Sequence, residues 1–101
     1  MDSLKLAWLA GLIDGDGSVE LSSQGKGRRR VPVIEVKMTC EATVRECLRI
    51  AGRGYVSKWK SIHKQQYRWR CKCGDALIVA AMVRSYVVTK RANIDMLLAI
   101  N

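Results

Sequence analysis

The sequence has few of the residues that hold a structural metal. His63 is its only histidine. The four cysteines are Cys40, Cys47, Cys71 and Cys73. They form no Cys-x-x-Cys pair and no second set of paired ligands, whereas structural zinc sites need four ligands in such spacings. A zinc site is therefore not expected, and the thiols are expected to be reduced and partly buried, as in cytosolic proteins.

Long apolar runs are also missing. No uncharged stretch is longer than residues 6–13, which fall well short of the ~20 apolar residues that cross a membrane. This stretch lacks the basic start and the small-residue cleavage site of a signal peptide. These absences predict an intracellular, cytoplasmic protein with no membrane partner, and they leave a bacterial, phage or organellar setting open.

Acidic residues are scarce relative to basic ones. Nine Asp and Glu stand against 18 Lys and Arg, which gives a formal charge of +9 and a pI near 9.8. Twelve of the basic residues but only one acid, Glu35, fall within residues 26–37 and 53–72. This segregation favours a polyanionic partner. The alternative is a solvated basic face that serves solubility alone, a role that does not require segregated charge.

The size and composition indicate one globular domain. A chain of 101 residues suits a single modest core, and 49% hydrophobic with 27% charged residues is ordinary for a folded protein. Residues 1–101 are therefore expected to form one domain. Residues 4–13 are almost continuously apolar, with Ala7, Gly11 and Gly15 spaced by four, which predicts a helix that is buried on both sides.

Periodicity in the rest of the chain predicts alternating hairpins and helices. Alternation in residues 18–22 and 33–38 predicts two strands, joined by a glycine-containing basic loop at 24–30. Thr39 is expected to cap a helix that ends near Ala51, before Gly52 and Gly54. A second hairpin is predicted from 55–60 and 66–73. Two further helices are predicted, one from Asp75 to Val83 and one from Thr89 to near Ile100.

Residues 9–17 carry the most specific motif. They read LAGLIDGDG and are followed by Ser18. This resembles the motif of the LAGLIDADG family of homing endonucleases in eight of nine positions, with Gly15 where the family name has Ala. The element order, the Gly-Arg-Gly-Tyr turn at 52–55 and the Lys-Arg-Ala-Asn segment at 90–93 are similar to the family over essentially the whole chain. The resemblance implies an α+β fold, αββαββα(α), with a curved antiparallel four-stranded sheet and helices on one face.

The small residues of the motif helix point to a dimer. Residues without bulk beyond Cβ let a second helix approach at backbone distance. With one motif in the chain, the second helix has to come from another copy, so a two-fold homodimer is expected. The expected interface residues are Ala7, Trp8, Gly11, Leu12 and Gly15.

The resemblance implies that Asp16 is a catalytic carboxylate. Asp16 would lie at the C-terminal end of the motif helix, where the macrodipole disfavours anions. In a dimer, the two Asp16 carboxylates would lie close together, and a divalent cation between them and the DNA phosphates would give this arrangement a catalytic use. Asp16 and Gly15 are the expected ligands of Mg²⁺ or Mn²⁺, and no other small-molecule cofactor is expected. Taken alone, Asp16 also fits a turn residue, and Asp14 is expected to have a capping or structural role.

The resemblance further implies that the sheet lies in the major groove of double-stranded DNA, which admits a two-stranded ribbon. The residues expected to contact DNA are Glu20, Ser22, Gln24, Arg28, Arg30, Glu35, Lys37, Lys58, Lys60, Arg68 and Arg70. In the second hairpin, alternation favours the four charged residues of this set as one outward face. The usual phase of the family instead exposes Tyr55, Ser57 and Trp59. Outside that phase Trp59 is interpreted as a core residue, as is Trp69.

Three further residues are candidates for a supporting catalytic role. Cys40 stands where many family members carry Gln, Asn or Asp, and Glu41 follows it. Lys90 is the nearest candidate for a basic residue that the family often supplies before the last helix, a position that aligns with Val88. The alternatives are a buried Cys40, a Glu41 in the first turn of a helix and a solvated Lys90.

The predicted function is a site-specific DNA endonuclease that makes a metal-dependent double-strand cut in a long pseudo-palindromic site as a homodimer. The alternative is a non-cleaving DNA- or RNA-binding protein of the same fold, a transcription regulator or splicing maturase, which Cys40 and Val88 favour. A third interpretation is a basic structural protein, which predicts no dimer and no effect of metal.

Overall fold

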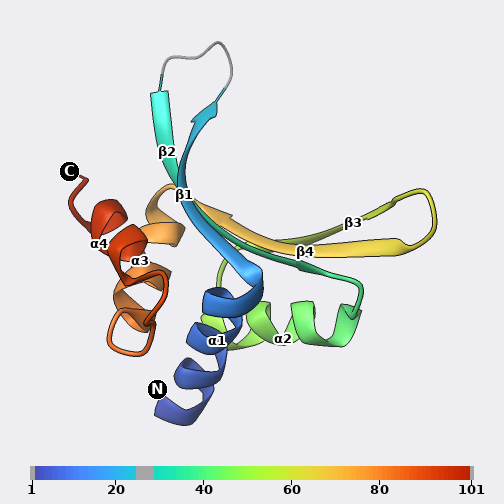
Figure 1. Cartoon of the computed structure of the whole chain (residues 1–101), viewed down its shortest axis with the longest axis horizontal. Helices are drawn as coiled ribbons and strands as arrows, with labels where there is room; N and C mark the ends of the chain where they lie inside the picture. Colours follow the sequence, from blue (N-terminus) through green and yellow to red (C-terminus); the bar gives the residue numbers. More distant parts are fainter. Residues whose placement is uncertain (1, 25–28, 101) are drawn as a thin grey trace.

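Alternating side chains build a sheet whose two faces have different surroundings. The computed structural model describes residues 2–24 and 29–100 (Figure 1). The spatial order of the strands is β1 (Gly17–Gln24), β2 (Arg29–Met38), β4 (Gln65–Lys72) and β3 (Tyr55–Lys60). All three neighbouring pairs are antiparallel. Each strand follows or precedes its hairpin partner in sequence, and β2 joins the two hairpins by pairing with β4.

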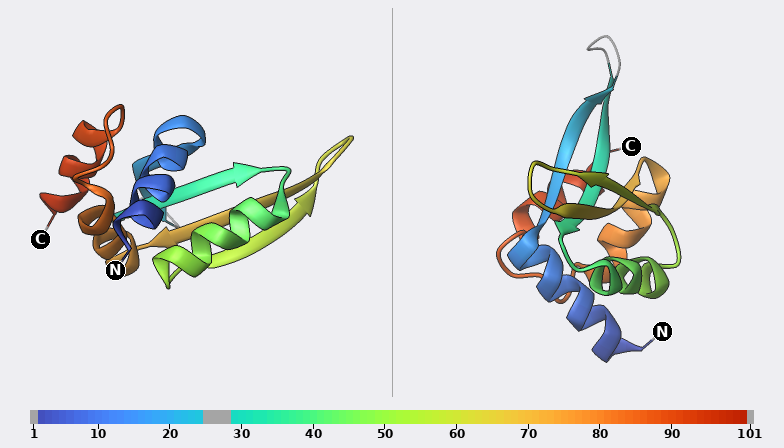
Figure 2. Two further views of the ribbon diagram at one scale, coloured as in Figure 1. Left: turned by 90° about the horizontal axis from the view of Figure 1, so that it is seen from below. Right: turned by 90° about the vertical axis from the view of Figure 1, so that its right-hand side faces the viewer.

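Four helices cover one face of this sheet. They are α1 (Ser3–Asp16), α2 (Glu41–Ala51), α3 (Gly74–Val83) and α4 (Arg91–Leu98). Figure 1 and the turned views of Figure 2 show them gathered on one side, while the two hairpins extend away from them in different directions. The predicted α+β fold with a four-stranded antiparallel sheet is confirmed, and the other sheet face is left open.

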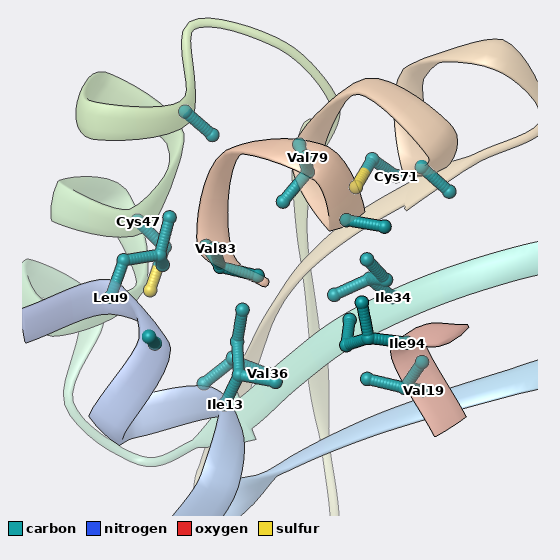
Figure 3. Packing of buried hydrophobic residues seen from close by; sticks show 14 of the residues in the cluster. Leu9, Ile13, Val19, Ile34, Val36, Cys47, Cys71, Val79, Val83 and Ile94 are labelled. Carbon is teal, nitrogen blue, oxygen red and sulfur yellow. The ribbon is translucent and has the colours of Figure 1, made fainter. Parts of the chain in front are cut away.

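The core lies between the sheet and the helices. Its buried residues come from all four helices and from β1, β2 and β4 (Figure 3). In α1 the buried residues follow a helical spacing: Leu6, Leu9, Ala10 and Ile13. In the strands, Val19, Ile34 and Cys71 lie side by side across β1, β2 and β4. Within the two described ranges, no helix is long and apolar enough to cross a membrane.

Trp69 fixes the second hairpin against the rest of the sheet. Its side chain is fully buried, and its indole Nε1 donates a hydrogen bond of 3.1 Å to the carbonyl of Arg53. Gly54 lies against it with a φ of +94°, and a Cβ there would come within 2.7 Å of the Arg70 carbonyl. Only glycine meets both requirements. The core position predicted for Trp69 is confirmed.

Two helices begin later than the sequence predicts. The N-cap of α2 is Cys40 instead of Thr39, and α4 starts at Arg91 with Lys90 as its N-cap. In neither helix does the side chain of the N-cap residue form a capping hydrogen bond with the backbone. Before α4, the Asp14 carboxylate on α1 accepts hydrogen bonds from the backbone N–H groups of Val88 and Lys90.

Candidate active site and nucleic-acid interface

Asp16 ends α1 at the edge of the open sheet face. The next residue, Gly17, already belongs to β1, so the helix passes into the sheet without a loop. This entry is tight, because a Cβ on Gly17 would lie 2.9 Å from the carbonyl oxygens of Glu35 and Ile13. Asp16 is exposed, and no other described residue forms a hydrogen bond or ion pair with its carboxylate. Its carboxylate is available to a ligand.

A depression adjoins Asp16 on the open face. Its lining residues are Asp16, Gly17, Ser18, Glu20, Glu35 and Lys37. Its volume is about 320 Å³. No group of three or more His, Cys, Asp or Glu side chains suited to a metal occurs in the described part of the chain.

Asp14 holds the segment before α4 against the end of α1. Its carboxylate accepts hydrogen bonds from the backbone N–H groups of Val88 at 2.7 Å and Lys90 at 3.0 Å. The Nζ of Lys90 donates back to the Asp14 carbonyl at 2.8 Å. Partial burial tends to raise the pKa of Asp14, but these amide bonds and the Lys90 charge outweigh it and lower the pKa below its ordinary value. The structural role predicted for Asp14 is confirmed.

Replacing Asp14 by Ala is expected to destabilise the protein at neutral pH. Two amides lose their acceptor, as when a helix cap is removed, which costs about 1 kcal/mol. Because the folded-state pKa is depressed, this contribution is present above the ordinary value of 3.8 and is lost as pH falls below it. Thermal melts should show a difference in melting temperature between the wild type and Asp14→Ala at pH 7, and this difference should be smaller at pH 3. Glu46→Ala, which breaks an exposed pair with Arg49, serves as the control. An unchanged melting temperature at pH 7 would contradict the role of Asp14.

The three supporting candidates lie in two places. Lys90 is at the motif end through its bond to the Asp14 carbonyl. Cys40 and Glu41 are at the N-terminus of α2, where Cys40 is exposed and Glu41 forms an ion pair of 2.8 Å with Arg45. No hydrogen bond or ion pair joins any of the three to Asp16 in the described structure. Their catalytic roles stay predictions.

The exposed Cys40 differs from the buried thiols in its chemistry. The Oγ1 of Thr43 donates a hydrogen bond of 3.1 Å to its Sγ, which lowers the pKa of the Cys40 thiol. Burial raises the pKa of Cys47 and Cys71 to about 12, so both remain protonated at neutral pH. Cys73, which precedes α3, is exposed. The expectation of partly buried thiols holds for two of the four.

Strand register assigns the predicted DNA-contacting residues of the first hairpin to faces. Val19, Ile34 and Val36 point to the helices, so the intervening residues lie on the open face. This set contains Ser18, Glu20, Ser22, Glu35 and Lys37. Arg30 belongs to β2 and not to the loop, and its alternation places it on the face of Ile34 instead. Gln24 pairs with Arg29 at the hairpin end, and Arg28 lies outside the described residues.

The prediction of a single charged face on the second hairpin is wrong for β3. Arg68 and Arg70 alternate with buried Trp69 and Cys71, so they lie on the open face as expected. Their partners in β3 are Ser57 and Tyr55, whereas Lys58 pairs with Tyr67 on the helix side. Lys58 and Lys60 are therefore on the opposite face from the arginines. The open face of β3 carries Tyr55, Ser57 and Trp59, the alternative phase.

Trp59 is accordingly not a core residue. It is 39% exposed, and the guanidinium carbon of Arg68 lies 5.6 Å from its ring centre, a cation–π distance. The sequence-based list also missed Ser18 and Lys72, which share the open face by register. Lys72 is two residues from Arg70 on the same strand, and this spacing could have identified it as a residue of the same face.

The family assignment rests on most of the chain. Residues 3–94 match the LAGLIDADG-like domain family. The chain belongs to the LAGLIDADG family. No curated protein sequence matches this LAGLIDADG chain.

Solved structures of homing endonucleases share the fold of this LAGLIDADG protein. I-CvuI in complex with its DNA target superposes with a TM-score of 0.79 at 23% identity, covering 94% of this chain and 64% of I-CvuI. The archaeal intron-encoded I-Vdi141I, complexed with DNA, gives 0.79 at 14% identity over 96% and 66%. The group I intron-encoded I-CeuI, also with DNA, gives 0.76 at 20% identity over 97% and 54%. The chain thus spans about two thirds or less of each of these proteins.

The motif helix of this LAGLIDADG protein is covered on one side only. Leu6, Leu9, Ala10 and Ile13 are buried, while the opposite side is exposed. That side carries Leu4, Ala7, Trp8, Gly11 and Gly15, with Leu12 partly buried at its margin. A Cβ built on Gly11 or Gly15 meets no atom within 4 Å. Packing within the described chain therefore does not require glycine at either position.

Proposed function

We propose that the chain is one subunit of a homodimeric endonuclease that depends on a divalent metal and cuts both strands of a long pseudo-palindromic DNA site. The observation that carries this proposal is the exposed small-residue side of α1, which ends at the free carboxylate of Asp16. A single chain gives the two open glycines no packing role. A second copy of the helix supplies one.

A two-fold pairing of α1 would bring two Asp16 carboxylates together. Small residues allow close helix contact, and an isologous interface uses the same patch on both subunits. Exposed Leu4 and Trp8, at 80% and 42%, would be removed from water at the same interface. The concentration of negative charge at two helix C-termini is unfavourable without a cation, which supports a metal at this point.

The donor set at the motif end fits Mg²⁺ or Mn²⁺. Both ions prefer carboxylate and carbonyl oxygen, which Asp16 and the adjacent Gly15 offer at the end of α1. When bound, such an ion stabilises the negative charge that develops on the phosphate during hydrolysis. Asp16 would hold the ion, while the Nζ of Lys90, fixed 2.8 Å from the Asp14 carbonyl, adds positive charge at the same end of the helix.

The open sheet face supports DNA as the ligand. Lys37 lies directly opposite Arg68, and like charges in such a pair destabilise a free sheet. A polyanion laid on this face would relieve the repulsion. The face also combines exposed aromatic and polar side chains with these cations, a composition suited to base edges as well as phosphates.

A steep dependence of DNA affinity on salt is expected. Two copies of the open face would release many counterions, and six or more phosphate contacts reduce affinity by about a thousandfold between 50 and 200 mM salt. Fluorescence anisotropy with labelled duplex across that range would measure the slope. Affinity that does not change with salt would contradict the assignment of the open face.

The non-cleaving binder remains a second candidate because of two exposed residues. Val88 is 78% exposed and offers no charge beside the motif end, and Cys40 offers a thiol at the start of α2. Plasmid linearisation distinguishes the two functions. A plasmid library of candidate sites should yield linear product with Mg²⁺ and none with a chelator if the proposal is correct. Site-specific binding without linear product would favour the binder.

A further inference from the structure

Arg68 and Arg70 are two residues apart on β4 and share the open face, but their neighbours differ in charge. In the cross-strand row of Arg70 lie Glu35 on β2 and Tyr55 on β3. In the row of Arg68 lie Lys37 on β2 and Ser57 on β3. One arginine therefore faces an acid and the other a second base.

The acid lies at ion-pair distance from Arg70. The Nε of Arg70 lies 3.7 Å from Oε1 of Glu35, and the two side chains are only 20% and 16% exposed. Salt screens a pair this well covered less than it screens a surface pair. The Nε atom of Arg70 is buried without a hydrogen-bond partner, as is that of Arg68, and neither terminal nitrogen of Arg70 has a partner among the described residues. The planar end of Arg70 is thus free to bind while its charge is already balanced.

Arg68 is placed by an aromatic ring and not by an acid. Its guanidinium lies over Trp59 at 5.6 Å, and within residues 2–24 and 29–100 no carboxylate lies within ion-pair distance. Lys37 directly across the strand pair adds to the positive potential. This uncompensated charge attracts phosphate at any DNA sequence.

We infer that Arg70 is the arginine that reads a base, that Glu35 is its positioning residue, and that Arg68 contacts phosphate. The inference rests on the proposed DNA-binding function and divides two residues that alternation alone treats as equivalent. Bidentate recognition of guanine requires a fixed planar fork. A balanced ion pair supplies that orientation and adds little net attraction to the backbone.

Charge-neutral substitution separates the two roles. The double variant Glu35→Gln with Arg70→Gln removes one charge of each sign, so the salt slope of binding should stay unchanged. Discrimination at one base pair in each half-site should fall by roughly tenfold or more, because one bidentate contact is lost. Arg70→Lys, which keeps the charge but not the fork, should show the same loss.

Arg68→Gln is expected to show the opposite pattern. The salt slope should fall by about one for each subunit, while discrimination among bases is retained. Lys58→Gln is the matched control, since it removes one charge on the other face of the sheet and should change the slope less. The measurement is anisotropy on a selected site and on its single-base-pair variants, at several salt concentrations.

Two outcomes would overturn the inference while leaving DNA binding in place. One is full discrimination by both Arg70→Lys and the double variant. The other is equal changes in slope and discrimination for Arg68→Gln and Arg70→Lys. Wild-type binding that ignores both salt and sequence would instead contradict the proposed function, and the inference with it.

Discussion

Asp16→Asn is expected to abolish DNA cleavage while DNA binding survives. The amide keeps the size of the side chain but removes one negative charge from each subunit, where the cation is expected to bind. Metal stabilisation of the reacting phosphate contributes several kcal/mol and each 1.4 kcal/mol is about tenfold in rate, so the loss should reach about a thousandfold or more. Gel assays of supercoiled plasmid with Mg²⁺ would measure it.

Binding and stability of the same variant provide the controls. Affinity should hold or increase, because two anions that face phosphates are removed. The melting temperature without metal should equal or exceed that of the wild type, since an anion leaves the negative end of the α1 dipole. Asp95 is an exposed acid on α4 that pairs with Arg84, and the Asp95→Asn variant should cleave DNA normally. Wild-type cleavage by Asp16→Asn would refute the metal-site assignment.

Gly11→Leu is expected to convert the dimer to a folded monomer. Gly11 is exposed in the chain and a Cβ there meets nothing, so the larger side chain should not disturb the subunit itself. At a helix-to-helix contact it would overpack both copies, at about 1–3 kcal/mol for each site. Light scattering and a thermal melt together would show a monomer mass with cooperative unfolding.

Gly74→Leu is the matched control for this change. Gly74 begins α3, is also exposed, and likewise has no atom within 4 Å of a built Cβ. Its variant should remain dimeric. A wild-type protein that is monomeric at micromolar concentration without DNA would count strongly against pairing through α1, as would a dimer that tolerates Gly11→Leu.

Local patterns predicted the elements because burial and periodicity agree along most of the chain. In β4, Trp69 and Cys71 are buried, whereas Arg68 and Arg70, which alternate with them, are not, as alternation requires. In β3, alternation does not identify which face is exposed. That edge strand has no fully buried residue, so its sequence of alternating aromatics and lysines fits either phase. Pairing with β4 decides the phase, and pairing is a long-range property.

Long-range contacts also explain the other differences from the sequence-based expectations. The Asp14 carboxylate bonds amides more than 70 residues away, in the segment just before α4, and the helix begins at Arg91, after the local Thr89 signal. The motif itself identified the end of α1 correctly. The structure places Lys90 at the end of α1, whereas Cys40 and Glu41 lie at the start of α2. The spacing of these residues in the sequence does not show which of them lies near the motif.

The most direct measurement of the central claim is the recovery of cut sites from a plasmid library incubated with the wild-type protein. With Mg²⁺ or Mn²⁺, the account predicts linear plasmids cut on both strands within an approximately two-fold symmetric sequence, and none with a chelator or with Asp16→Asn. A wild-type protein that binds a defined site tightly but never cuts it with either metal would contradict the account.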